Sequence, residues 1–287
     1  MAFVVPRDSS FHFPPQRFLA LACALALLAP VAGWGHGELH EAIAVLDSEI
    51  VARPGEAALY LRRGELYRKH ADWLKAAADY DRAAALDPSL AVVDLARGAL
   101  GIEARRFEVA RAALDRFIAS RPDDPAGYAG RARLLRRQKE PLAAAQDFAR
   151  AVALSRPPAP ELFLEAAEAL REAGRPGEAV AVLDDGIARL GPLVTLAAMA
   201  LDLEAALGRT DAELRRVDAL IATAPRKEGW LYRRGTILEE SGKLADARAA
   251  YEQALVAIAA VPEYRRATEA TRTLQEKIEA ALGRVRR

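Results

Sequence analysis

The chain repeats a pattern of small apolar residues and prolines at intervals of 34 positions. The matching positions are Gly64 and Gly98, then Ala76, Ala110 and Ala144, and then Pro88 and Pro122. After Pro157 and Pro158 the matching positions are shifted by one residue toward the C-terminus, to Ala179, Gly235 and Ala247. A fixed period of this length is typical of proteins built from stacked supersecondary units, each of which contacts its neighbours. The period therefore predicts a solenoid.

Composition indicates that each repeat is helical. The 287 residues include 65 alanines, whereas aromatic residues make up only 6%, and Ala is the best helix former and a poor strand former. The formal net charge is +1, so the chain does not have the excess of basic residues that is typical of a nucleic-acid binder. A single cysteine, Cys23, excludes an internal disulfide and a thiolate metal cage. We expect an all-α protein with no cofactor, no metal and no nucleic-acid partner.

The first copy, residues 57–90, indicates how such a pattern packs two helices. Small residues such as Gly64 and Ala76 let two antiparallel helices approach closely, and a large residue such as Tyr80 fills the remaining space. Pro88 cannot continue a helix, so it is expected to end the second one. Each copy is thus predicted to be a helix pair that is stable only when stacked on its neighbours.

These residues resemble the tetratricopeptide repeat, whose pattern is W-x2-L-G-x2-Y…A-x3-F…P. The resemblance implies a right-handed α-solenoid of stacked antiparallel helix pairs, and a non-catalytic scaffold that binds a protein or peptide in a concave groove. About six copies are expected, at residues 57–90, 91–124, 125–158, 160–193, 194–227 and 228–261. The first and last copies match best. The fifth matches least, because Glu213 stands at a packing-alanine position.

The segments at the two ends of the repeats are expected to cap the stack. Residues 36–56 are predicted to form an N-terminal capping helix, as half of a repeat. Residues 262–287 are predicted to form a C-terminal capping helix and tail, with Leu274, Ile278 and Leu282 on one stripe. An exposed apolar patch on that last helix would favour an alternative function, as a structural or assembly subunit of an envelope complex.

Residues 1–35 are typical of a secretory signal peptide. Two arginines precede the apolar run 18–33, which is shorter than the roughly 20 residues of a membrane span. Cleavage is expected after Gly33 or Gly35, which places the mature protein in the periplasm or outside the cell. A retained membrane anchor, the only expected membrane contact, and lipidation of Cys23 remain alternatives.

The resemblance also assigns candidate binding residues, because the first helix of each tetratricopeptide repeat lines the inner groove. The candidates are Arg62, Arg68, Lys69, Leu95, Ile102, Arg133, Arg136, Arg137, Glu165 and Glu168. Basic residues of the first and third copies would precede an acidic patch of the fourth. Such a groove suits a peptide with an acidic end, since an arginine fork binds a carboxylate in bidentate fashion. The alternative is that these arginines only keep the solenoid soluble.

Two narrower functions are judged from single residues. Some family members clamp a chaperone tail with Lys and Asn, but Leu61, Glu65 and Ala96 stand at those positions here, so that recognition is not expected. His36 and His40 lie four residues apart, and whether they bind Cu(II) or Ni(II) is left open. No catalytic motif is present, and the chain is not expected to be an enzyme.

Overall fold

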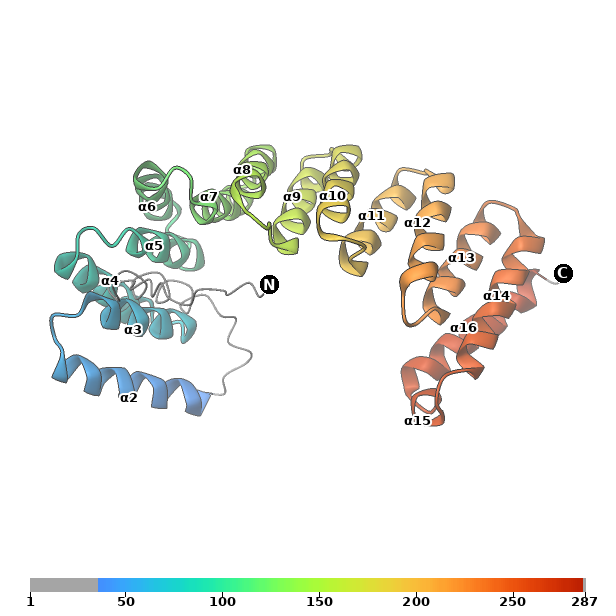
Figure 1. Cartoon of the computed structure of the whole chain (residues 1–287), viewed down its shortest axis with the longest axis horizontal. Coiled ribbons are helices and arrows are strands. Elements are labelled where there is room, and N and C mark those ends of the chain that lie inside the picture. Colours follow the sequence, from blue (N-terminus) through green and yellow to red (C-terminus); the bar gives the residue numbers. More distant parts are fainter. Residues whose placement is uncertain (1–35, 286–287) are drawn as a thin grey trace, which may run out of the picture. The chain divides into compact units, whose positions relative to one another are not determined.

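The structure is a computed structural model that describes residues 36–285, and within this range the chain forms helices and no strand. The helices are α2 (His36–Ala52), α3 (Ala57–Lys69), α4 (Trp73–Leu86), α5 (Val92–Glu103), α6 (Phe107–Ser120), α7 (Pro125–Arg137), α8 (Pro141–Leu154), α9 (Pro160–Glu172), α10 (Pro176–Leu190), α11 (Val194–Ala206), α12 (Thr210–Thr223), α13 (Glu228–Glu240), α14 (Leu244–Ala259), α15 (Glu263–Arg266) and α16 (Glu269–Val285). Short turns join them into antiparallel pairs, such as α7 with α8 (Figure 1). The predicted class, an α-solenoid of stacked helix pairs, is confirmed.

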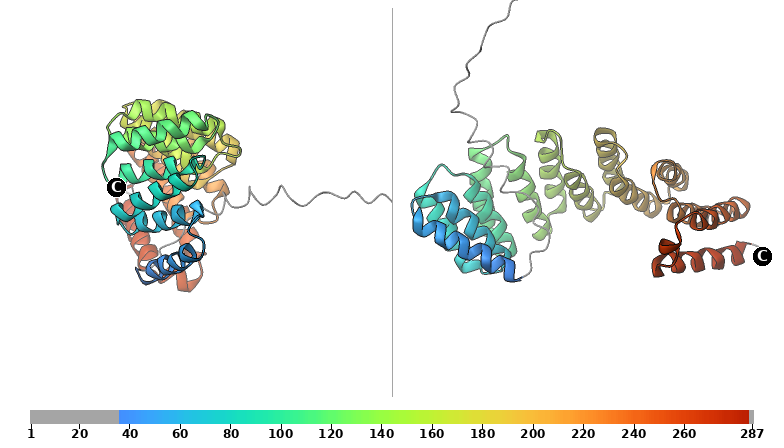
Figure 2. Two further views of the ribbon diagram at one scale, coloured as in Figure 1. Left: turned by 90° about the vertical axis from the view of Figure 1, so that its left-hand side faces the viewer. Right: turned by 60° about the horizontal axis from the view of Figure 1, so that its bottom comes forward.

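The chain divides into two compact units. The first ends at Ala96 and contains α2, α3, α4 and the start of α5, and the second begins at Arg97. In the first unit α3 packs against both α2 and α4. In the second unit the helices from α6 to α14 pack in chain order, and α16 lies beside α14 (Figure 2). No helix of residues 36–285 combines the length and the apolar character needed to cross a membrane.

Every helix pair except α11 and α12 is held close by a small residue in its first helix and a larger one 16 positions later in its second helix. In the first unit, a Cβ placed on Gly64 would lie only 2.6 Å from the ring of Tyr80, and Tyr80 has no exposed surface. The equivalent pairs of the second unit are Gly98 and Leu114, Ala132 and Phe148, Ala167 and Leu183, and Gly235 and Tyr251. The alanines and glycines of the repeat are therefore the points where two helices meet most closely.

The buried tyrosines also satisfy their hydroxyl groups. Tyr80 donates a hydrogen bond of 2.6 Å to Glu65, and Tyr251 donates one of 2.6 Å to Glu239. Burial and the bond to Glu239 raise the pKa of Tyr251 to about 12, so its hydroxyl stays protonated and continues to donate at neutral pH. A tyrosine can thus fill the space opposite a glycine without leaving a buried polar atom unpaired.

We predict that Gly235→Val destabilises the second unit by about 2–3 kcal/mol, because the added atoms overlap the buried ring of Tyr251 and the core must open. Urea denaturation followed by circular dichroism measures the change. Gly283→Val is the matched control, since Gly283 also lies in a helix of this unit but has no neighbour within 4 Å. Equal effects of the two substitutions would contradict the close-approach argument.

The turn inside each helix pair holds one residue in the left-handed conformation. These residues are Ala71, Arg105 and Lys139, and then Gly174, Gly208 and Gly242. At Lys139 the φ angle is 63°, and the N–H of Glu140 donates a bond of 2.9 Å to the carbonyl of Leu135. Only glycine adopts this conformation without a steric penalty. The first three repeats therefore carry turn strain that the last three avoid.

The same turn residues locate the one-residue shift in the period. Neighbouring left-handed residues are 34 positions apart, except that Lys139 and Gly174 are 35 apart. The additional residue lies in the loop 155–159 between α8 and α9, which is one residue longer than the loop 121–124 between α6 and α7. The longer loop contains Pro157, close to the point where the sequence pattern becomes late.

We predict that Lys139→Gly stabilises the second unit by about 0.5–1 kcal/mol. It relieves a left-handed penalty of about 1–2 kcal/mol, part of which the greater freedom of glycine in the unfolded chain offsets. Lys139 is exposed, and it forms no ion pair within the described part of the chain. The reverse change Gly174→Lys should destabilise by a similar amount, as Gly174 has open space around it. Urea midpoints test both, and a loss of stability in Lys139→Gly would refute the strain.

The C-terminal segment differs from the single capping helix expected within residues 262–287. It breaks at Ala267 and Thr268 into the short α15 and the longer α16. The Thr268 hydroxyl accepts a long hydrogen bond of 3.4 Å from the N–H of Thr271, as a helix-capping side chain does. Ile278 and Leu282 are buried where α16 meets α14. The apolar stripe of α16 is therefore covered, and the exposed patch that would favour the assembly-subunit alternative is not seen on it.

Candidate functional site

Two of the three arginines predicted to line the groove in the third repeat are already paired with carboxylates of the fourth. Arg133 on α7 forms a bidentate pair with Glu165 on α9, with both N–O distances 2.8 Å. Arg136 donates to Glu168 over 2.8 Å. Arg137 is exposed and forms no ion pair with another residue of 36–285. The expected basic and acidic patches of this region are thus largely one ion-pair network that neutralises itself.

The other predicted residues are divided between the two units. Arg62 and Lys69 are exposed on α3, and Arg68 bonds to a glutamate of the same helix at 2.7 Å. Leu95 and Ile102 are half-buried on α5, with Leu95 in the first unit and Ile102 in the second. Their part in binding stays a prediction.

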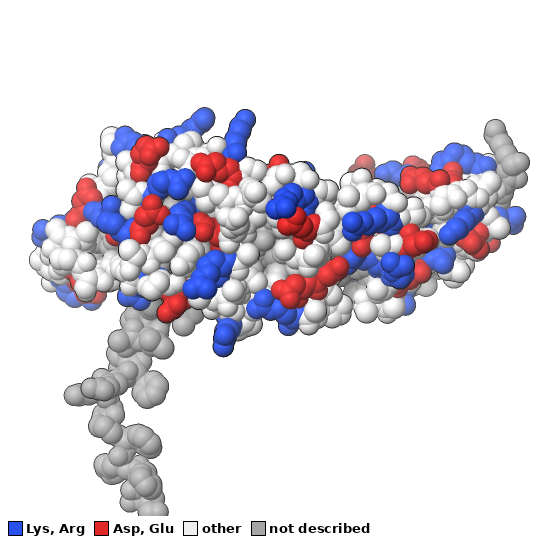
Figure 3. Space-filling model, turned by 90° about the horizontal axis from the view of Figure 1, so that it is seen from above, with Lys and Arg blue, Asp and Glu red and all other residues white. Residues whose placement is uncertain are grey.

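Other arginines tie the first helix of a repeat to two second helices at once. Arg131 binds Asp147, 16 residues later, through two bonds of 2.7 and 3.0 Å, and it binds Asp115, 16 residues earlier, at 3.0 Å. Arg63 in the first unit binds aspartates at the same two offsets. Figure 3 shows basic and acidic side chains next to one another over the face that it draws. These arginines hold helices together and have little capacity left for a ligand.

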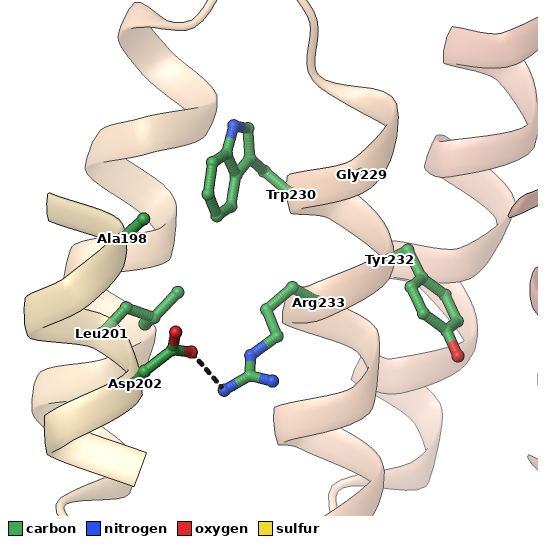
Figure 4. Close-up of a pocket in the computed structure, with 7 residues that line it drawn as sticks. All are labelled: Ala198, Leu201, Asp202, Gly229, Trp230, Tyr232 and Arg233. Carbon is green, nitrogen blue, oxygen red and sulfur yellow. Dashed lines mark ion pairs between the residues drawn. The ribbon is translucent and has the colours of Figure 1, made fainter. Parts of the chain in front are cut away.

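An open hollow of about 370 Å³ lies between α11 and α13 (Figure 4). It is lined by Ala198, Leu201, Asp202, Gly229, Trp230, Tyr232 and Arg233. In Figure 4 the side chains of Trp230 and Arg233 extend from α13 toward α11. Its volume is at the lower end of the range of roughly 300–1,000 Å³ that small-ligand pockets occupy. The hollow can therefore take one or two side chains of a partner.

The fifth repeat, which forms one side of this hollow, reverses the usual size pair. Leu201 on α11 stands where other repeats have Gly or Ala, and Val217 on α12 stands where they have a larger residue. Both are almost fully buried, with 2% and 0% of their surface exposed. Leu201 also lines the hollow, so the reversed pair supplies an apolar wall to it.

Arg233 combines partial burial with an incomplete set of hydrogen bonds. Its Nη2 atom lies 3.2 Å from Glu213 and 3.5 Å from Asp202, and its Nε atom is shielded from solvent with no hydrogen-bond partner. By contrast, every guanidinium nitrogen of Arg216 donates to a carboxylate at 2.7–2.9 Å. A separation of 3.5 Å is too long for a strong hydrogen bond. Arg233 thus keeps unused donor capacity beside an open hollow.

Next to the hollow, α11 presents a side with almost no charge. Ala198 and Ala205 are partly exposed there, Val194 is 42% exposed, and Asp202 is the one charged residue among them. The equivalent positions of α9, 34 residues earlier, include two charged residues, Glu168 and Arg171. A helix that is apolar on all sides is normally covered on all sides, but this side of α11 is uncovered within the described residues.

The sequence prediction missed Trp230 and Arg233. Binding residues were assigned from the first four repeats alone, whereas Trp230 and Arg233 belong to the sixth. One signal was present, namely that the segment 194–206 contains only two charged residues, Asp202 and Glu204. So few charges in the first helix of a repeat would have indicated that its outer surface contacts another part of the chain or a partner.

Histidine residues come together in the first unit. His40 and His70 lie edge to face, with 4.8 Å between their ring centroids. The side chain of His36 is outside the described part of the chain. Among the described residues, no three His, Cys, Asp or Glu side chains are grouped so that they could hold a metal ion.

The comparisons with known proteins agree with the architecture. Residues 95–160 match the sequence model of the tetratricopeptide repeat. The fold is similar to a tetratricopeptide repeat protein from Parabacteroides merdae ATCC 43184, with a TM-score of 0.50 and 16% identity over 88% of this chain and 93% of that one. It is also similar to PilW, a widely conserved type IV pilus biogenesis factor, with a TM-score of 0.55 and 21% identity over 66% of this chain and 87% of PilW.

A third similar structure is pilF of Pseudomonas aeruginosa, with a TM-score of 0.50 and 14% identity over 78% of this chain and 96% of that one. No curated protein gives a significant match. The antiparallel pairs and their period define the chain as an α-solenoid of helix-turn-helix repeats. The family model identifies residues 95–160 as tetratricopeptide repeats, and the similar structures show that the chain shares the fold of tetratricopeptide repeat proteins. This fold is used for interactions between proteins.

Glu213, the buried carboxyl group that contacts Arg233, is expected to make the folding stability depend on pH. Burial raises the pKa of Glu213 above its ordinary value of 4.5, although Arg233 acts in the opposite direction. A raised pKa in the folded state means that folding favours the protonated form. The stability associated with this group is therefore present below pH 4.5 and is lost as the pH rises through the folded-state pKa.

We predict that Glu213→Gln becomes more stable relative to the wild type as the pH rises from about 4 to 7, because glutamine has no charge to bury. Urea denaturation at several pH values measures this difference. The exposed Glu276→Gln in the same unit is the control and should show no comparable trend. A difference for Glu213→Gln that does not change with pH would contradict the raised pKa.

Proposed function

We propose that this protein is a non-catalytic adaptor of the bacterial envelope, which binds a peptide or protein segment along the first helices of its second unit. The observation that carries this proposal is the uncovered apolar side of α11 next to the hollow that contains Trp230. Tryptophan and arginine in a partly desolvated depression are the residues most often responsible for binding energy at protein interfaces. The proposal adds a particular surface to the general capacity of the fold for binding proteins.

The binding surface proposed here differs from a continuous basic groove. Arg133 and Arg136 are bound to glutamates, so a partner could engage them only by displacing those carboxylates. Arg137 and Arg233 retain the capacity to interact with an acidic group. Apolar contact on α11 therefore supplies the main attraction, and acidic groups of the partner set its position.

The location in the envelope rests on residues 1–35, which lie outside the described residues. We expect intact-mass analysis and N-terminal sequencing of the protein from cells to give a chain that begins at Trp34 or His36, recovered from the periplasmic fraction. A chain that retains Met1 and fractionates with the membrane would support the anchored form. A full-length chain in the cytoplasmic fraction would refute export.

The adaptor function predicts that partner capture depends on Trp230. We expect the tagged protein to capture a partner reproducibly from envelope extracts, and Trp230→Ala to reduce the captured amount by about tenfold or more, as loss of an interface anchor does. Tyr264→Ala is the matched control, because Tyr264 is an aromatic residue of the same unit that is 69% exposed outside the hollow.

Circular dichroism must show that both variants are folded. Equal loss of capture in both variants, or undiminished capture by folded Trp230→Ala, would remove the hollow from the proposed function. Wild-type protein that captures no partner would count against the adaptor itself.

A further inference from the structure

We infer that the hollow recognises a carboxylate next to a large apolar side chain, with Arg233 binding the carboxylate and Trp230 and Leu201 packing on the apolar group. This inference rests on the proposed adaptor function and gives the chemistry of the segment that is bound. The partner is thus expected to present an acidic group and an adjacent Leu-like or aromatic residue.

The carboxylate is inferred from the hydrogen bonds that Arg233 does not make. Its Nε atom has no acceptor, and Nη2 is its one bonded nitrogen among the described residues. Arg133 shows how a guanidinium in this chain binds a carboxylate through Nε and Nη2 together. The Arg233 side chain is 38% exposed, so a carboxylate that enters the hollow can reach its guanidinium. A rotation of that side chain would then bring the shielded Nε atom to the carboxylate and complete the same bidentate arrangement. It would satisfy a buried donor that is costly to leave unpaired.

The two carboxylates already near Arg233 leave room for a third. Asp202 has 76% of its side chain exposed and reaches Arg233 only at 3.5 Å, so it can turn into solvent at little cost. Glu213 is buried, and burial disfavours its charged form. Neither one therefore fully balances the charge of the guanidinium, and an incoming anion is favoured.

A basic ligand group is the opposite possibility, since Asp202 and the Trp230 ring could together hold a cation. Such a ligand would leave the Nε atom of Arg233 without an acceptor and would place two positive charges in one small hollow. The balance of hydrogen bonds and charge thus selects the anion. The two possibilities also predict opposite effects of removing the charge of Asp202.

The apolar part of the ligand is inferred from the lining. Ala198 and Leu201 come from α11, and the Trp230 indole lies opposite them on α13 (Figure 4). The open space of about 370 Å³ accepts a side chain but is small for a folded element. The carboxylate and the apolar group must therefore be close together in an extended segment.

Four short peptides test the inference with purified full-length protein. All are N-acetylated, and three are C-terminally amidated with a central Leu-Asp, Leu-Asn or Leu-Lys pair. The fourth ends in leucine with a free carboxylate. Binding is followed through the NMR signal of the Trp230 indole N–H, assigned by its loss in Trp230→Phe. We expect the Leu-Asp peptide to bind about tenfold more tightly than the Leu-Asn peptide, because only the former forms charge-assisted bonds to Arg233.

Three variants show whether the named residues cause that preference. Arg233→Gln should abolish the difference between the Leu-Asp and Leu-Asn peptides, whereas Arg215→Gln should preserve it, because Arg215 is exposed on α12 and does not line the hollow. Asp202→Asn should tighten binding of the Leu-Asp peptide, since it removes a competing carboxylate. Binding of the fourth peptide would add a chain-end carboxylate to the accepted ligands, and failure of that peptide would restrict them to acidic side chains.

Equal binding of the Leu-Asp and Leu-Asn peptides, tighter binding of the Leu-Lys peptide, or no shift of the Trp230 signal with any peptide would overturn the inference. Weaker binding of the Leu-Asp peptide by folded Asp202→Asn would do the same. These results would leave the adaptor function to be judged by partner capture, which depends on Trp230 but requires no acidic ligand. The two proposals can therefore fail separately.

Discussion

The close approach of two helices at one small residue determines most of the architecture. Where Gly64 meets Tyr80, or Ala132 stands 16 positions before Phe148, the two helices of a pair have a single possible separation and register. Because each pair is built in the same way, side chains at equivalent positions meet equivalent neighbours. This is why Arg131 and Arg63 both reach aspartates 16 residues before and 16 residues after them. The ion pairs depend on the spacing that the small residues allow.

The sequence predicted the fold well, because the small and large residues that carry the period are also the ones that pack. It predicted the surface poorly. Arg133 and Glu165 were interpreted as members of separate patches, although they lie 32 residues apart and their side chains bind each other. With a period of 34, residues separated by 32 fall on adjacent first helices within reach of long side chains. The 34-residue period alone therefore implies that Arg133 and Glu165 are neighbours. The sequence interpretation treated them as separate because they are far apart along the chain.

The hollow could not be derived from the family pattern, because one of its two sides, α11, lies where the pattern fails. Leu201 and Val217 reverse the sizes expected at their positions, and no residue of α11 matches the motif strongly enough to fix its register from sequence alone. The turn at Lys139 is a similar case. A left-handed lysine has no local sequence signature, and only comparison with Gly174 and Gly208 at equivalent positions identifies the conformation that the turn requires.

On α11, the residues that pack the core and those that face outward are largely different. Leu196 and Ala200 are buried in the core, whereas Ala198, Asp202 and Ala205 are not. Because each repeat contacts mainly its neighbours, substitutions at the outward positions leave the stack largely intact. Ligand preference can therefore diverge between related proteins, or be redesigned by exchanging a few outward side chains, while folding stability is inherited unchanged.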